Sequence, residues 1–202
     1  MNRLYDNTDS GNGYKVRLFL TQLGLPFERI ELDTERGETR TPDFLARNPN
    51  GKIPLLELAD GRRLAESDAI LFYLAEGTSY LPTDRFERAQ VLQWMFFEQY
   101  SHEPNIAVAR HWLRHLEITP ERRSALTQKQ KQGHAALAVM ERHLTGRTFF
   151  VADRYTIADI ALYAYTHVAD QGGFDLTPYP EIRTWLGRIA TQPGWIAMLP
   201  AD

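Results

Sequence analysis

The feature that most constrains the fold is a change of pattern near residue 77. Before this point, short segments with the two-residue period of strands alternate with segments of helical period, whereas only helical periods follow it. Strands alternating with helices are typical of an α/β domain, and a run of helices packs into a layer of its own. The sequence therefore predicts an α/β domain over residues 1–77, a linker over 78–83 and an all-α domain over 84–202.

The first domain carries the signals of four strands and three helices, separated by turn formers such as Asp60-Gly61. Their order predicts a four-stranded mixed sheet with helices on its faces. The expected strands span 3–6, 28–33, 53–58 and 63–65. The expected helices contain Val16, Pro42 and Asp68, and Ser67 is expected to cap the third helix.

Pro54 stands inside the strand expected over residues 53–58. Proline has no N–H to donate to a neighbouring strand. The strand therefore either lies at an edge of the sheet or contains a proline with a special task.

The second domain is expected to contain four helices. The first spans 84–116 with a kink at Pro104, and its apolar face is formed by Ala89, Leu92, Phe96 and Tyr100. The second spans 120–144, and its apolar face is formed by Gly133, Leu137, Met140 and Leu144. The third begins at Thr156, and the fourth has helical spacing at Ile182, Trp185, Leu186 and Ile189.

Thr156 and Asp159 have the spacing of a capping box, with Asp in place of Glu or Gln. In this motif two side chains satisfy the free N–H groups at the start of a helix. Asp159 is therefore expected to be buried and structural rather than catalytic.

Composition excludes several classes of function. The 23 basic and 26 acidic residues give a net charge of -3, which argues against nucleic acid as a partner. No apolar run reaches the ~18 residues of a membrane-spanning helix, and the polar start of the chain has no signal-peptide pattern. The chain has no cysteine, which excludes disulfides, Cys-based metal sites and a protein thiol nucleophile, and which fits a cytoplasmic location.

Four segments, LYDNTDSGNGYKVRLFL, NPNGKIPLLEL, AESDAILFYLAE and YTIADIALYAY, carry a family pattern across essentially the whole chain. In this order and spacing the chain resembles the cytosolic glutathione transferases. The resemblance implies a thioredoxin-like N-terminal domain that binds glutathione, an all-helical second-substrate domain, a homodimer and a role in detoxification. It implies glutathione as co-substrate and no metal.

The first loop is most similar to the bacterial nu class, with Ser10 where that class has Thr, followed by one spacer and Asn12-Gly13-Tyr14-Lys15. The resemblance implies that Ser10 and Asn12 hold the glutathione sulfur as a thiolate. A thiol with a pKa of about 8.5 is only about 3% ionised at pH 7, and a pKa of about 6.5 requires about 2.7 kcal/mol of stabilisation. A hydroxyl, an amide and a helix N-terminus can supply that. Alternatively, Ser10 only caps the helix and Asn12 only forms a turn.

The resemblance also implies the rest of the glutathione site. Ile53, before a cis-proline, would pair through its backbone with the cysteinyl backbone of glutathione, as an added strand. Ser67 lies at a helix start, which suits the γ-glutamyl carboxylate, and Glu66 can meet the α-amino group. The alternatives are a structural turn proline at Pro54 and a plain cap at Ser67.

Lys52 and Thr39 are weaker candidates for glutathione binding. Lys52 can pair with the glycyl carboxylate, although a lysine beside a turn is usually only solvated. Thr39 aligns with a polar ligand of the nu class, and its neighbour Arg40 is a rival for that role.

Second-substrate candidates come from the long helix of the second domain. They are Tyr100, His102, His111 and Trp112, and the alternative for each is a core or solvated position. His111 and His115 stand four residues apart, but the segment His-Trp-Leu-Arg-His lacks the Glu of a zinc-protease motif, so no metal is expected there.

These observations predict a glutathione transferase whose bound thiolate attacks an electrophilic, apolar substrate. A glutathione-dependent disulfide oxidoreductase is the first alternative, in which two glutathione molecules supply both sulfurs and a disulfide is turned over faster than an aryl halide. A non-catalytic interaction module is the second, and it predicts weak glutathione binding or a bound neutral thiol.

Overall fold

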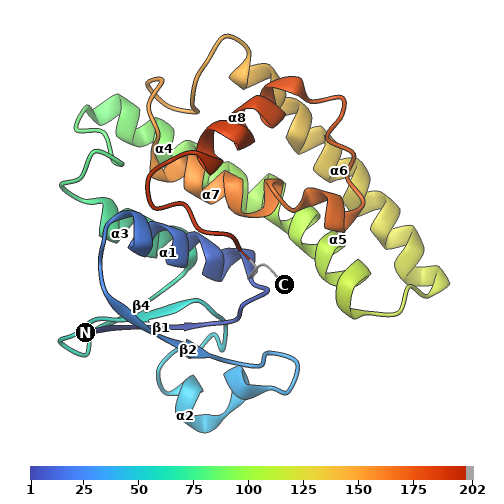
Figure 1. Cartoon of the computed structure of the whole chain (residues 1–202). Helices are drawn as coiled ribbons and strands as arrows, with labels where there is room; N and C mark the ends of the chain where they lie inside the picture. Colours follow the sequence, from blue (N-terminus) through green and yellow to red (C-terminus); the bar gives the residue numbers. More distant parts are fainter. Residues whose placement is uncertain (199–202) are drawn as a thin grey trace. The chain divides into compact units, whose positions relative to one another are not determined.

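Residues 1–77 form a four-stranded mixed sheet in the computed structural model, which describes residues 1–198 (Figure 1). The strands are β1 (Asn2–Asp6), β2 (Phe27–Glu31), β3 (Leu55–Glu57) and β4 (Arg63–Ala65), in the order β2-β1-β3-β4. β1 pairs with β2 in parallel and with β3 antiparallel, and β3 pairs with β4 antiparallel. The predicted mixed sheet is confirmed.

Helices α1 (Gly11–Gln22) and α3 (Ser67–Ala75) cover one face of this sheet, and α2 (Pro42–Leu45) covers the other, after the 3-10 turn η1 (Glu38–Arg40) (Figure 1). The alternation of side chains along a strand explains these layers. On one face Leu4 and Leu56 pack with residues of α1 and α3, namely Val16, Leu20 and Ile70. On the other face Tyr5 and Leu55 pack with Phe44 of α2.

Pro54 precedes β3 and lies outside the strand. β3 is an interior strand between β1 and β4, so the edge-strand explanation of this proline is wrong. The pairing of both neighbours begins at Leu55, and the Ile53–Pro54 peptide bond just before it is cis.

Residues 78–192 form a separate, all-helical unit. Its elements are α4 (Arg85–Phe97), the π-helical turn η2 (Glu98–His102), α5 (Glu103–His115), α6 (Pro120–Leu144), α7 (Ile157–Thr166), the 3-10 turn η3 (Ala169–Gly172) and α8 (Pro180–Ala190). All ten residues of α7 are buried, so α7 is the core of this unit. At the position of the expected kink the chain forms a π-helical turn, and Pro104 follows it in the first turn of α5.

The predicted apolar face of α4 is wrong. Phe96 and Tyr100 are 68% and 87% exposed, whereas Val91, Trp94 and Met95 are buried. α4 carries apolar residues on two sides, so helical periodicity allowed two inward faces. The predicted face of α6 is correct, because Gly133, Leu137, Met140 and Leu144 are all buried.

The segment from Pro193 groups with residues 1–77, although the sequence analysis placed it in the helical domain. The Tyr14 hydroxyl donates to the Ile196 carbonyl at 2.7 Å, and the Arg17 guanidinium donates to the Met198 carbonyl at 3.4 Å. These two side chains of α1 replace hydrogen bonds that an irregular segment cannot make within itself.

Ser67 is the first residue of α3 and not its cap, which corrects the prediction. The cap position belongs to Glu66, whose φ of 67° is unusual for a residue other than glycine. A short loop between β4 and α3 must turn sharply at this point, and sequence patterns do not record that turn.

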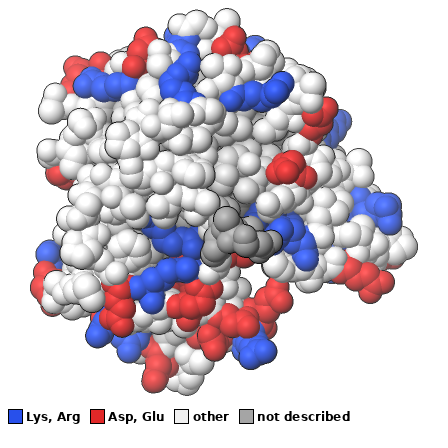
Figure 2. Space-filling view, viewed as in Figure 1, with Lys and Arg blue, Asp and Glu red and all other residues white. Residues whose placement is uncertain are grey.

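On the face shown in Figure 2, basic and acidic side chains both occur, and neither sign forms one continuous field. Within residues 1–198, no helix combines the length and the apolar character needed to cross a bilayer.

The predicted capping box at the start of α7 is present, and it is deeply buried. Asp159 accepts hydrogen bonds from the Thr156 N–H and hydroxyl at 2.9 and 3.1 Å, the Phe150 N–H at 3.1 Å and the Trp185 indole at 3.0 Å. Burial raises the pKa of the Asp159 carboxyl from 3.8 to about 6, against the opposing effect of these donors.

This pKa predicts how stability depends on pH. Because the folded-state pKa lies above the unfolded value, the contribution of Asp159 is full below pH 3.8 and is lost as pH rises through 6. A difference of about two units corresponds to about 3 kcal/mol. Urea unfolding between pH 4.5 and 7.5 should show native stability falling with pH relative to Asp159→Asn.

The control is Asp153→Asn, at an exposed carboxylate close by. It should leave the pH profile of unfolding unchanged. A difference between native protein and Asp159→Asn that is constant with pH would contradict the prediction.

Candidate active site

Ser10 is the N-cap of α1. Its Oγ accepts a hydrogen bond from the Gly13 N–H at 3.1 Å. A hydroxyl has one proton and two lone pairs, so the cap uses a lone pair and the proton stays available for donation. The first turn of α1 itself contains no acidic residue, and an anion bound there would meet the positive end of the helix dipole.

Asn12 and Ser67 bring the starts of α1 and α3 together. The Ser67 hydroxyl donates to Asn12 Oδ1 at 3.3 Å, across 55 residues of sequence. Ser67 is buried and Asn12 is half-buried. Two residues proposed for opposite ends of one ligand are thus hydrogen-bonded to each other.

Lys15 and Asp68 complete this cluster, and the sequence analysis gave neither a role. Lys15 is fully buried, and its Nζ lies 3.4 Å from Ser67 Oγ and 3.2 Å from Asp68 Oδ1. Burial raises the pKa of the Asp68 carboxyl, and the Lys15 ammonium opposes that rise. The available signal was position, because Lys15 stands four residues before Phe19 on the inward side of α1.

Glu66 is exposed beside this cluster. Its positive φ turns the chain into α3 and places the first N–H groups of the helix at the cluster. Strained residues of this kind gather at functional sites.

Ile53 and Lys52 lie in the turn that leads into β3. Strand pairing begins at Leu55, so the backbone of Ile53 lies beyond the last paired residue of the described sheet. The Lys52 carbonyl accepts a hydrogen bond from Asn48 Nδ2 at 2.8 Å, which fixes the turn, while the Lys52 side chain is exposed.

Thr39 is buried in η1, and Arg40 is exposed beside it. The Arg40 guanidinium donates to the Asn50 carbonyl at 3.0 Å. A Cβ added to Gly51 would lie 2.9 Å from the Thr39 carbonyl. η1 therefore packs against the turn that carries Lys52.

A second buried carboxylate lies beneath the first turn of α1. Asp6 is fully buried, and its Oδ2 lies 3.2 Å from Nε of both Arg17 and Arg29. Its Oδ1 has no hydrogen-bond partner among residues 1–198. Burial raises the pKa of the Asp6 carboxyl, and the two guanidinium groups oppose that rise.

The four second-substrate candidates are not gathered within the helical unit. His102 is fully buried, and its Nε2 lies 2.9 Å from the Thr166 hydroxyl, so it is a core residue of the unit. His111 is exposed, with its ring 5.2 Å from that of His115, and Trp112 is half-buried.

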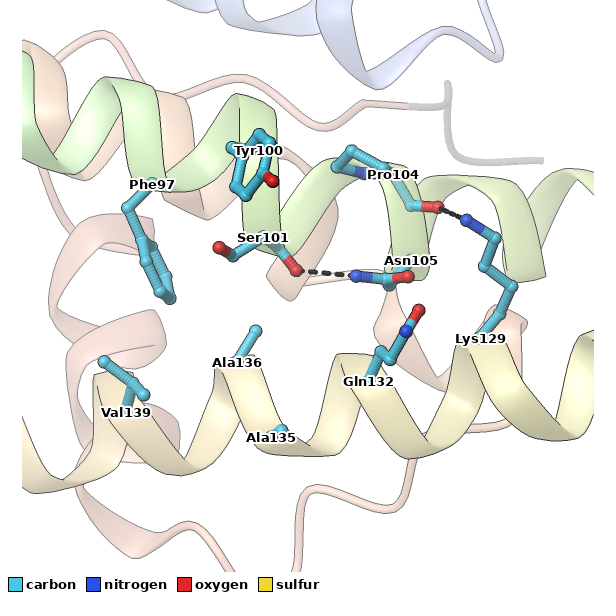
Figure 3. Close-up of a pocket in the computed structure, with 10 residues that line it drawn as sticks. All are labelled: Phe97, Tyr100, Ser101, Pro104, Asn105, Lys129, Gln132, Ala135, Ala136 and Val139. Atoms are coloured by element: carbon cyan, nitrogen blue, oxygen red, sulfur yellow. Dashed lines mark hydrogen bonds between the residues drawn. The ribbon is translucent and has the colours of Figure 1, made fainter.

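Tyr100 lines a groove of about 490 Å³ between η2, the start of α5 and α6 (Figure 3). Phe97, Ala136 and Val139 give this groove an apolar part. Asn105 and Lys129 stand on its polar side, where they donate to the Ser101 and Pro104 carbonyls at 2.8 and 2.7 Å. Within residues 1–198 no group of three or more His, Asp or Glu could hold a metal ion.

The fold and the site define a class. A thioredoxin-like α/β domain, in which the starts of α1 and α3 are hydrogen-bonded and a cis-proline precedes an interior strand, is followed by an all-helical domain. The chain matches the family "Glutathione S-transferase, N-terminal domain" over residues 2–76 and "Glutathione S-transferase, C-terminal domain" over residues 93–193. It belongs to the glutathione S-transferase family.

Several known proteins are similar to the chain in sequence, and for solved structures also in fold. A solved glutathione S-transferase from Pseudomonas fluorescens Pf-5 is 52% identical, with a TM-score of 0.97 over 98% of this chain and 99% of that one. The disulfide-bond oxidoreductase YfcG of Escherichia coli K12 is 32% identical over 90% of this chain and 87% of its own length. Ure2p in complex with glutathione is 26% identical, with a TM-score of 0.86 over 96% and 90%.

Gly13 is required by the close approach of Asp6 to α1. An ideal Cβ at Gly13 would lie 1.5 Å from Asp6 Oδ1. Ala normally stabilises a helix interior relative to Gly by about 0.5–1 kcal/mol. We expect Gly13→Ala instead to lower the free energy of unfolding by about 1–3 kcal/mol, the usual cost of overpacking, because the first turn of α1 must move.

Gly187→Ala in α8 is the matched control, since nothing described lies within 4 Å of its added Cβ. It should raise stability by about 0.5–1 kcal/mol. Equal stabilisation by the two substitutions in urea unfolding would overturn the argument for Gly13.

Proposed function

We propose that this protein is a glutathione transferase that holds glutathione along the α/β domain of residues 1–77. The observation that carries the proposal is the hydrogen bond between Asn12 and Ser67, which joins a donor suited to the sulfur to the helix start suited to the γ-glutamyl carboxylate. Glu66 would meet the α-amino group, and the backbone of Ile53, which lies beyond the last pair of the described sheet, would pair with the cysteinyl residue. The solved complex of Ure2p with glutathione supports this ligand.

The glycyl end of glutathione would lie toward the turn before β3. Lys52 has an exposed ammonium there, and Arg40 offers a second cation beside it. The buried position of Thr39 favours its backbone, rather than its side chain, for any contact with the ligand.

The chemical step needs a thiolate, which Ser10 and Asn12 would stabilise. The Ser10 proton and an Asn12 N–H would donate to the sulfur at the positive end of α1. The thiolate attacks an electrophilic carbon, a C–S bond forms, and the leaving group departs with its electron pair. Preorganised donors of this kind stabilise charge without the reorganisation that water requires.

The second substrate and the dimer are proposed from the helical unit. Tyr100 and Trp112, and with them His111, are the candidates to contact an apolar substrate, whereas the buried His102 would act only through packing. Phe96 and Tyr100 are the proposed contacts with a second copy, because both are large, exposed aromatic side chains and they stand four residues apart.

The thiolate proposal predicts the pKa of bound glutathione. It should lie about two units below that of a free thiol, and Ser10→Ala or Asn12→Ala should each raise it by about one unit, because each removes a hydrogen bond to a charged group. Titration of the thiolate ultraviolet band measures it. Thr21→Ala, which removes a hydroxyl at the far end of α1, is the control and should change nothing.

An undepressed pKa in the native protein would overturn the transferase mechanism. Together with weak binding, it would favour a non-catalytic interaction module. If the pKa of bound glutathione is depressed and does not change in Ser10→Ala, the thiolate is stabilised by Asn12 and the helix terminus.

A glutathione-dependent disulfide oxidoreductase is the second candidate, favoured by the similarity to YfcG. The chain has no cysteine, so two glutathione molecules must act. The first thiolate attacks the substrate disulfide and releases one substrate thiol. The second attacks the mixed disulfide, which releases the other substrate thiol and glutathione disulfide.

Substrate preference separates the two candidates. We expect kcat/KM for a chloronitrobenzene to exceed that for a small dialkyl disulfide at the same glutathione concentration, because the described site supplies sulfur donors for one thiolate. The reverse order, with two glutathione molecules consumed per turnover, would assign the disulfide reaction.

A further inference from the structure

The start of α1 and the start of α3 are joined by one continuous chain of polar contacts. It runs from Asn12 Oδ1 to Ser67 Oγ at 3.3 Å, from Ser67 Oγ to Lys15 Nζ at 3.4 Å, and from Lys15 Nζ to Asp68 Oδ1 at 3.2 Å. Lys15 and Ser67 are buried, so water does not readily substitute for these contacts. The mechanism described above uses Asn12 and Ser67 but gives Lys15 no part.

The direction of the hydrogen bonds in this chain follows from the chemistry of its members. An ammonium can only donate, so Ser67 Oγ must accept from Lys15. The single proton of the Ser67 hydroxyl is then directed to Asn12, which must present an acceptor, its Oδ1. An amide carries its oxygen and its NH2 on opposite sides, so the NH2 of Asn12 is turned away from Ser67.

We propose that Lys15 is a positioning residue, whose buried ammonium fixes the Asn12 side-chain amide with its donor end toward the glutathione sulfur. This inference rests on the proposed function. Without the ammonium, the Ser67 hydroxyl can accept from Asn12 instead of donating to it. The amide can then turn its oxygen toward the sulfur, where it repels a thiolate.

Asp68 is the counter-charge that keeps Lys15 in place. An ammonium without a partner is costly to bury, and the carboxylate at the second position of α3 offsets that cost. Glu66 is the other charged group of this corner, and it acts on Asp68 through its negative charge. Lys15, Asp68 and Glu66 thus set the local field, and only Lys15 contacts Ser67 as a donor.

The test is a set of variants at Lys15, with the thiol pKa of bound glutathione as the readout. Lys15→Met removes the ammonium and keeps the stem. Lys15→Met with Asp68→Asn removes both charges and avoids an unpaired buried carboxylate, in case the single variant does not fold. Lys15→Arg retains a donor-only cation and is the rescue variant.

In both Met-containing variants the thiol pKa should rise by about one unit, the same shift expected for Asn12→Ala. In Lys15→Arg the thiol pKa of bound glutathione should stay near that of the native protein. The affinity for S-methylglutathione, which has no thiol, should change less than the affinity for glutathione. Glu57→Gln is the control for loss of ion pairs in the same unit, because Glu57 on β3 pairs with Arg3, Arg47 and Arg63.

Combining Lys15→Met with Asn12→Ala distinguishes positioning from a direct effect of charge. If Lys15 acts through Asn12, the double variant has the thiol pKa of Asn12→Ala alone. Two results would overturn the inference while leaving the proposed function intact. One is a thiol pKa in Lys15→Met with Asn12→Ala above that of Asn12→Ala alone. The other is no rise of the thiol pKa in Lys15→Met or in Lys15→Met with Asp68→Asn. A native protein whose bound thiol has an ordinary pKa would overturn both.

Discussion

The hydrogen bond between Ser67 and Asn12 is the contact on which the rest of the site depends. It fixes the starts of α1 and α3 relative to each other on one face of the sheet. Each helix start offers free N–H groups and a positive field, and neither alone could recognise a ligand with a sulfur at one end and a charged amino acid at the other. In the proposed function, the two joined helix starts form a single binding site for such a ligand.

Buried charge makes this arrangement specific. Two ion clusters lie at α1, namely Lys15 with Asp68, and Asp6 with Arg17 and Arg29. Apolar packing of Leu4, Val16 and Leu56 brings α1 to the sheet but tolerates small rotations. A buried ion pair does not tolerate such rotations of α1, because a rotation that breaks the pair leaves a buried charge without a partner. The Asp6 carboxylate also limits residue 13 to glycine, so the first turn of α1 has one position.

Much of this could be predicted from the sequence, for identifiable physical reasons. The order of the elements follows from the two periods, and the inward face of α6 follows from a single apolar stripe. The capping box at Thr156 and Asp159 is local, so its three-residue spacing was sufficient. Ser10 and Asn12 were placed by the family pattern of the first loop, and the structure puts both at the start of α1.

The remainder depends on partners that are distant in sequence. α4 has two apolar sides, and packing against α7, His143 and Phe150 selects the side that carries Trp94. The positive φ of Glu66 is dictated by how β4 leads into α3, so Ser67 could be mistaken for the cap. Lys15 is the clearest case, because a lysine inside a helix is usually solvated, and its burial depends on an aspartate 53 residues away.

The absence of cysteine determines what chemistry the candidate site must supply. A chain without cysteine has no thiol nucleophile of its own, so in the proposed function the reacting sulfur comes from the ligand. Stabilising an anion requires hydrogen-bond donors, but an amide can turn its oxygen toward the anion and a hydroxyl can turn its lone pairs toward it. For Ser10, the Gly13 N–H occupies one of the two lone pairs, and the hydroxyl proton remains available for donation. The orientation of the Asn12 amide depends on its neighbours instead. A cation that can only donate, hydrogen-bonded to Ser67, is the simplest group that directs the Ser67 proton to the Asn12 oxygen.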